Sequence, residues 1–201
     1  LDAISHPPLA AAVLDLANFL MRRGFITEHP AKARVGELAT LLGSLAQRLA
    51  AIEERPQEYA STPVELSKTG NDAVTLVVSL CDTMALVGDP SVVGKLHQTL
   101  GLAHRRVQTE AAAALARLGD TRGIEHLKQL AVQPASRTRA LAYLEELGSL
   151  GQVDEQYRTP EARAAGEIAG GRAQPTRGGG ALDMLELLDH KGEYWPGGHG
   201  P

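Results

Sequence analysis

The sequence predicts an all-α protein, a right-handed α-solenoid of short stacked helical pairs preceded by an antiparallel helical hairpin. Aromatic residues make up only 3% of its 201 residues, and small or unbranched apolar side chains dominate, which favours close packing of helices over sheets. Leucines and other apolar residues recur at steps of three and four, as on one face of a helix. A Gly-Asp turn also recurs 31 residues apart, at Gly88 and Gly119, which indicates a structural repeat.

Composition and charge set limits on function. The formal net charge is -4 with both signs interspersed, which argues against a dedicated nucleic-acid surface or a polybasic membrane anchor. The single cysteine, Cys81, has no partner for an internal disulfide, so we expect a reducing, cytoplasmic location. We find no uninterrupted apolar run near the roughly 18 to 20 residues that span a bilayer and no signal-peptide pattern. The chain begins at Leu1 rather than Met, which suggests a piece of a longer protein.

We predict that residues 1–56 form the helical hairpin. The first helix carries four apolar residues at steps of four, three and four and stops at Gly24; the four are Leu9, Val13, Leu16 and Leu20. The second helix alternates steps of three and four through Val35, Leu38, Leu42, Leu45, Leu49 and Ile52. A coiled-coil dimer is the rival interpretation. The hairpin is favoured because the second seam is shorter than three heptads and has a partner in the same chain.

Residues 57–71 predict a connection with one short helical turn. Within it, Thr62 can cap a helix whose first residue is Pro63 and whose capping-box glutamate is Glu65;. A domain boundary is expected here.

Residues 72–170 predict the repeats. One helix ends at Gly88 and another at Gly119, and the following residues, Asp89 and Asp120, can cap the next helix;. A looser third unit ends at Gly148, 29 residues after Gly119. Loosening of this kind is typical of terminal repeats.

Residues 105–130 read RRVQTEAAAALARLGDTRGIEHLKQL, with an Arg-rich start, an Ala-rich first helix, a Leu-Gly-Asp turn and an apolar second helix. Over roughly residues 72–148 this pattern resembles the HEAT-repeat family, in particular its short bilin-lyase-type variant. The resemblance implies stacked helical pairs that serve as a binding scaffold. It also leaves open that the chain is a subunit of a bilin lyase-like enzyme. HEAT arrays have many unrelated roles, so the pattern is specific for architecture and not for activity.

After the repeats, Thr159 and Pro160 can start a closing helix that runs to about Gly170;. Residues 171–201 form a Gly/Pro-rich, partly irregular tail whose aromatic pair, Tyr194 and Trp195, is expected to anchor the tail on the solenoid or to contact a partner.

No catalytic, metal or cofactor site is predicted. Cys81 shares a helical face with Val77, Leu80 and Met84, so we expect an inert, buried thiol. The histidines of the repeats (His97, His104 and His126) show no metal-ligand spacing. The glycines at 178–180 follow no strand and lack the lysine of a phosphate-binding loop;.

A HEAT-like nucleic-acid-binding module is the other alternative function. Its grip on a phosphate backbone would use the arginines of the repeats, namely Arg105, Arg106, Arg117, Arg122, Arg137 and Arg139;. Neighbouring acids dilute this charge, and we expect most of these arginines to be solvated or paired with carboxylates. Binding to nucleic acid is therefore not favoured.

The preferred function is a non-catalytic scaffold for another protein. We expect the second helix of each helical pair to line the concave side of the array. Equivalent positions of successive repeats then lie in rows, with Lys95 over His126 and Gln98 over Gln129. The candidate partner surface comprises Lys95, Gln98, Arg122, His126, Gln129 and Trp195.

Overall fold

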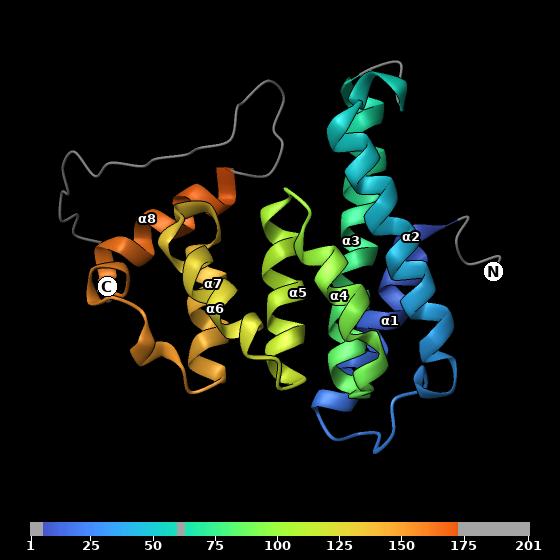
Figure 1. Cartoon of the computed structure of the whole chain (residues 1–201), viewed down its shortest axis with the longest axis horizontal. Helices are drawn as coiled ribbons and strands as arrows, with labels where there is room; N and C mark the ends of the chain where they lie inside the picture. Colours follow the sequence, from blue (N-terminus) through green and yellow to red (C-terminus); the bar gives the residue numbers. More distant parts are fainter. Residues whose placement is uncertain (1–5, 60–62, 173–201) are drawn as a thin grey trace, which may run out of the picture.

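The computed structural model describes residues 6–59 and 63–172 (Figure 1). In these residues it contains helices and turns and no strand, which confirms the all-α prediction. The α-helices are α1 (Pro7–Arg22), α2 (Val35–Glu54), α3 (Pro63–Val87), α4 (Val93–Leu100), α5 (Arg105–Arg117), α6 (Thr121–Val132), α7 (Pro134–Glu146) and α8 (Pro160–Arg172). Single 3-10 turns precede α2 and α4, follow α2, and occupy much of the link between α7 and α8.

The helices stack side by side along one axis, which confirms the solenoid (Figure 1). One row is α1, α3, α5 and α7, in which each helix packs against the next. The other helices alternate with this row: α4 packs against α5, α6 lies between α5 and α7, and α8 packs against α7. Neighbouring pairs therefore bury their apolar faces against one another.

Both helices of the predicted N-terminal hairpin form, but each finds its main partner further along the chain. Helix α1 packs against α3, and α2 packs against α3 and α4. One core cluster runs without a break from Ala11 on α1 to Leu115 on α5. The two N-terminal helices thus pack on the array mainly through α3 and α4 rather than against each other. The stripe predicted on α2 is confirmed, because Leu42, Leu45, Leu49 and Ile52 are buried.

The stripe predicted on α1 does not face the core. Leu9, Val13 and Leu16 are 65%, 61% and 59% exposed, and Leu20 is half-buried. The opposite side of α1, with Ala11 and Asn18, is buried against α3. Helix α1 is apolar on both sides, and periodicity alone does not show which side a neighbour covers.

The predicted connection is also shorter than expected. Helix α3 begins at Pro63, as the capping pattern indicated, but it continues through Gly70 without interruption. A single interior glycine costs a helix only about 1 kcal/mol, which packing of the following turns against α1 and α2 offsets. Among the described residues, the segment Gly70–Val87 is long and apolar enough to cross a membrane by length and composition, and half of it is buried inside the array.

The turns behave as the sequence predicts. Four glycines have φ between +67° and +85°, namely Gly24, Gly88, Gly119 and Gly148. This left-handed conformation ends a helix, and glycine adopts it without the steric strain that a Cβ atom would cause. The Asp89 carboxylate accepts a bond from the Ser91 amide at 2.8 Å, and that of Asp120 from the Arg122 amide at 3.0 Å. At Gly88 and Gly119, one helix is therefore ended by a left-handed glycine and the next begins with a capping aspartate.

Helices α5 and α6 approach each other unusually closely at Gly123. A Cβ atom at this position would lie 2.4 Å from the Ala116 backbone nitrogen and 2.5 Å from the Ala112 carbonyl oxygen. The Ala-rich face of α5 is correspondingly buried. Small side chains therefore set the distance between the two helices, and that distance fixes the surface described next.

Candidate partner-binding surface

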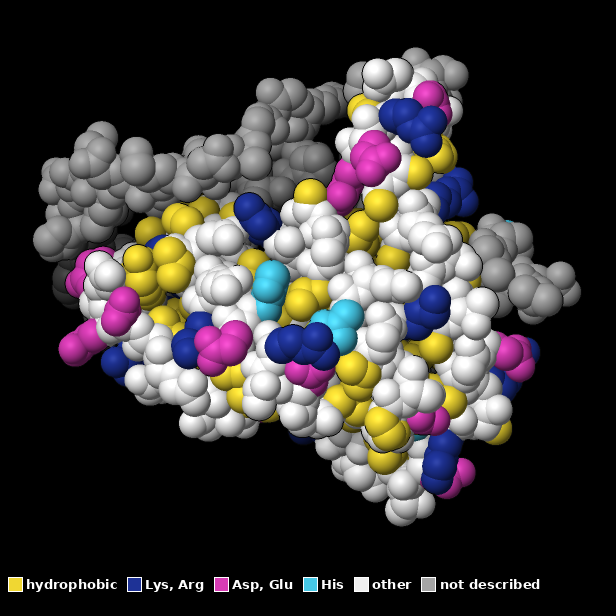
Figure 2. All heavy atoms as spheres, viewed as in Figure 1, with side chains coloured by type: hydrophobic (Ala, Val, Ile, Leu, Met, Phe, Trp, Pro, Cys, Tyr) yellow, Lys and Arg dark blue, Asp and Glu magenta, His cyan; other side chains and the backbone are white. Residues whose placement is uncertain are grey.

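The structure places the five described candidate residues on α4 and α6. Gln98, Arg122 and Gln129 are exposed, and Lys95 and His126 are half-buried. Figure 2 shows a face of the array on which charges of both signs are scattered and histidine side chains lie near the middle. The remaining candidate, Trp195, lies outside the described residues. We call the exposed side of α4, α6 and the first turn of α5 the α4–α6 face.

Two cations on the α4–α6 face bond only to neutral amides. The Lys95 ammonium donates to the side-chain oxygen of Gln98 at 3.4 Å, and the Arg105 guanidinium donates to that of Gln108 at 3.0 Å. Neither residue forms an ion pair with a carboxylate of the described chain. The Lys95 stem also covers Gly43 of α2, where a Cβ would meet its Cδ at 3.1 Å. These two positive charges are therefore held in place without being neutralised.

The other charges of the face are paired. Arg122 bonds to Asp120 at 2.9 Å, and Lys128 bonds to Glu125 at 3.1 Å. Asp120 also bonds to His97 Nε2 at 2.7 Å, which ties α4 to the turn before α6. The Arg122 guanidinium, with help from His97, holds the pKa of Asp120 far below its usual range. The carboxylate is therefore charged at every physiological pH, and the link between α4 and α6 persists.

Two histidines near this face are disposed to stay neutral. Burial lowers the pKa of His104, and burial together with the charge of Arg105 lowers the pKa of His126. Desolvation penalises the charged imidazolium, and a nearby cation repels it. Near pH 7 both rings therefore offer hydrogen bonds and no net charge.

Most of the arginines that binding to nucleic acid would require form ion pairs or hydrogen bonds within the chain. Arg117 bonds to Glu146 through two nitrogens, at 2.9 and 3.0 Å. Arg139 pairs with Glu110, and Arg122 with Asp120. Arg137 is buried and donates to the backbone carbonyls of α6 at Ala131 (3.0 Å) and Val132 (2.7 Å) and of α8 at Ala162 (3.0 Å). The prediction that arginines of the repeats pair with carboxylates is confirmed for Arg117, Arg122 and Arg139, whereas the structural role of Arg137 was not predicted.

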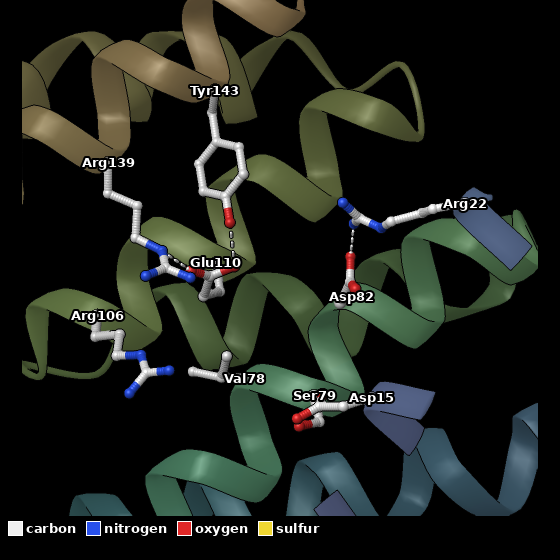
Figure 3. Close-up of a pocket in the computed structure, with 9 residues that line it drawn as sticks. All are labelled: Asp15, Arg22, Val78, Ser79, Asp82, Arg106, Glu110, Arg139 and Tyr143. Carbon is white, nitrogen blue, oxygen red and sulfur yellow. Dashed lines mark hydrogen bonds and ion pairs between the residues drawn. The ribbon is translucent and has the colours of Figure 1, made fainter. Parts of the chain in front are cut away.

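A hollow of about 230 Å³ opens between α1, α3, α5 and α7 (Figure 3). Three arginines and three acids line it, so its walls carry no net charge; they are Arg22, Arg106, Arg139, Asp15, Asp82 and Glu110. Dashed lines in Figure 3 join Arg22 to Asp82, and Arg139 and Tyr143 to Glu110. The hollow is thus lined by ion pairs between successive helices of the row.

Glu110 is the centre of this network. It is 4% exposed and accepts a hydrogen bond from the Tyr143 hydroxyl at 2.6 Å. Burial, followed by the Glu110 charge, raises the pKa of Tyr143 to about 12. The Arg117 guanidinium lies 4.9 Å from the centre of the Tyr143 ring. This meeting of positions 110 and 139–143 was not predicted; the signal for it in the sequence is the repeat spacing of about 30 residues.

A profile of HEAT repeats matches residues 66–148, which covers α3 through α7 and includes the turns at Gly88 and Gly119. Residues 66–148 carry HEAT repeats. No curated protein and no solved structure matches it. HEAT repeats generally mediate interactions between proteins. The match does not distinguish the bilin-lyase-type variant, so that assignment stays a prediction.

Within the HEAT array, Cys81 is fully buried, and burial raises the pKa of its thiol strongly. This confirms the prediction of a buried thiol that does not readily form a thiolate. Among residues 6–59 and 63–172, no three His, Cys, Asp or Glu side chains gather as metal ligands do.

Proposed function

We propose that this HEAT array is a non-catalytic scaffold that binds another protein along the α4–α6 face, and that the bound segment is acidic. The observation that carries the proposal is the pair of cations, Lys95 and Arg105, which bond only to neutral amides. The general role of HEAT repeats in protein interaction supports the first half of the proposal.

The acidic character of the partner follows from the cost of exchanging hydrogen bonds. A carboxylate that replaces the amide of Gln98 or Gln108 forms a charge-assisted bond, which is roughly twice as strong as a bond to a neutral acceptor. No internal ion pair has to break at Lys95 or Arg105. At Arg122 and Lys128, in contrast, a partner competes with Asp120 and Glu125. The unneutralised cations therefore contribute most to binding.

The face is also preorganised. The His97–Asp120 bond and the close contact at Gly123 fix α4 and α6 relative to α5. A rigid surface loses little conformational entropy when a partner binds. We accordingly propose a static mechanism, in which the scaffold presents a curved helical surface and makes or breaks no covalent bond. We also propose a cytoplasmic location, because the only cysteine is buried and reduced.

Site-specific photo-cross-linking tests the proposal. A photoreactive amino acid replaces Gln98 or Gln129 on the face, and Gln57, on the turn after α2, or Glu167, on α8, in the controls; both control residues are exposed. We expect one protein, rich in Asp and Glu at the cross-linked segment, from both face positions and from neither control. Cross-links of equal yield at all four positions, or to nucleic acid, would contradict the proposal.

Charge variants make the test quantitative once that protein is in hand. Lys95→Glu and Arg105→Glu are each expected to weaken its binding about 10-fold or more, since each turns an attraction into a repulsion. The matched control is Arg48→Glu on the exposed side of α2. Equal affinities of the two face variants and the control, measured by calorimetry, would refute the role of the face.

A further inference from the structure

Helix α1 leaves one apolar side uncovered. Leu9, Val13, Leu16 and Phe19 are exposed along it, and Phe25 is 72% exposed directly after its end. We call these five side chains, together with the half-buried Leu20, the α1 face. On the opposite side α1 packs against α3 with small apolar residues. A helix that is apolar on both sides is typical of a position between two neighbours, of which this structure supplies one.

The size of the α1 face indicates an interface. Exposed leucine, valine and phenylalanine side chains at these fractions present on the order of 500 Å² of apolar surface, near the upper end of the 300–600 Å² patch found on a typical monomer. A stable interface buries about 800 Å² on each partner. This area consists of an apolar centre and a polar rim. The α1 face is large enough to supply such a centre.

The spacing of the face makes it complementary to itself. Leu9, Val13, Leu16 and Leu20 follow one another at steps of four, three and four, which read the same in both directions. When two such helices pair antiparallel about a two-fold axis, Leu9 lies opposite the partner's Leu20, and Val13 lies opposite the partner's Leu16. Each of these four apolar side chains then meets another apolar side chain, as an isologous contact requires.

Charge favours the same arrangement. The positions that flank the seam are Ala10, Ala12, Ala17 and Phe19, so no like charges oppose each other across it. Arg23, whose guanidinium lies 5.5 Å from the centre of the Phe19 ring, is the charge at the end of the face. Antiparallel pairing places the two copies of Arg23 at opposite ends, roughly 25 Å apart at 1.5 Å per residue, whereas parallel pairing would set them side by side.

We propose that two copies of this chain associate through their α1 faces, antiparallel and about a two-fold axis. The pairing extends the row α1, α3, α5 and α7 of one copy into the same row of the other. It uses a surface separate from the α4–α6 face, so each dimer presents two scaffold surfaces.

Analytical ultracentrifugation of the full chain, from 1 to 200 μM, tests association. We expect a species of twice the 21.3 kDa of one chain. Leu16→Glu is expected to raise the dissociation constant roughly 30-fold or more, as loss of a central contact does. The control is Ile168→Glu on α8, also an exposed apolar residue, which should leave the dimer intact. Circular dichroism of all three proteins verifies folding. A wild-type monomer at 200 μM, including one that binds a different protein through α1, would overturn the proposal.

Disulfide trapping tests the orientation. Leu9→Cys and Leu20→Cys variants are mixed and oxidised; the native Cys81 is buried and should not react. Antiparallel pairing predicts the mixed disulfide and little Leu9→Cys homodimer, because two copies of position 9 lie roughly 16 Å apart along the axis. Homodimer as the main product would overturn the antiparallel arrangement. Lys95→Glu should leave the dimer unchanged, which separates failure of this inference from failure of the scaffold function.

Discussion

Substitution of Gly123 by alanine is expected to destabilise the array although alanine is the better helix former. The new Cβ would lie 2.4–2.5 Å from backbone atoms of Ala116 and Ala112. Ordinary contact begins near 3.5 Å, so α6 must move about 1 Å from α5. Backbone atoms of a buried helix have no rotamer to change, and the shift also loosens the packing of Leu127 and Leu130, which are buried in the same cluster.

The magnitude follows from two opposing effects. Alanine gains about 1 kcal/mol of helix propensity over glycine. Overpacking a core by one methyl group costs typically 1–3 kcal/mol and more where backbone must move. Because the clash here is with two backbone atoms of α5, we expect a net loss of about 2 kcal/mol in the free energy of unfolding.

Urea denaturation followed by circular dichroism measures this change. The matched control is Gly94→Ala in α4, where a Cβ meets nothing within 4 Å and stability should rise by up to about 1 kcal/mol. If both variants were equally stabilised, the reasoning that α5 and α6 touch through their backbones would be refuted. The Gly123→Ala variant should also bind the scaffold's partner more weakly, since the spacing of the α4–α6 face changes.

Two further predictions concern buried polar groups. Arg137→Met keeps much of the side-chain volume but leaves three carbonyls of α6 and α8 without their donor, and a loss of about 3 kcal/mol is expected in the same urea assay; a change below 1 kcal/mol would contradict it. The free energy of unfolding should also fall between pH 7 and pH 5, because burial lowers the pKa of His29 from 6.5. The unfolded chain takes up the proton first, so the contribution of His29 is complete above pH 6.5 and is lost as the pH falls towards the folded-state pKa. The loss for this residue is at most about 1.4 kcal/mol per pH unit. The slope should be smaller in His29→Gln, and an unchanged slope would rule out His29 as its source.

The features that the sequence predicted are local ones. A left-handed glycine followed by a capping aspartate is a short-range device, so the turns at Gly88 and Gly119 could be located from the sequence alone. The buried stripe of α2 followed from periodicity because that helix has one clearly apolar side, and the buried thiol of Cys81 followed because Val77, Leu80 and Met84 share its helical face. In these cases the local pattern and the tertiary contact agree.

The features that were not predicted depend on which helix packs against a given side of another helix. Helix α1 offers two apolar sides, and the contact of Asn18 with Thr83 and with the Ser79 carbonyl on α3 decides between them. That contact joins residues more than 60 positions apart. The same holds for Arg137, whose acceptors are carbonyl groups that carry no signature in the amino-acid sequence. Long-range polar contacts of this kind become visible only when the helices are placed.

The first and last helices of the described array, α1 and α8, differ in a way that bears on assembly. Helix α8 exposes Glu161 and Glu167 beside the apolar Ile168, whereas the α1 face carries a continuous apolar stripe. Head-to-tail stacking would require α8 to complement α1, and the exposed Glu167 carboxylate would then be desolvated against leucines;. Pairing of α1 with α1 avoids this cost and closes after two copies. The difference between the ends therefore favours a finite dimer over an open filament.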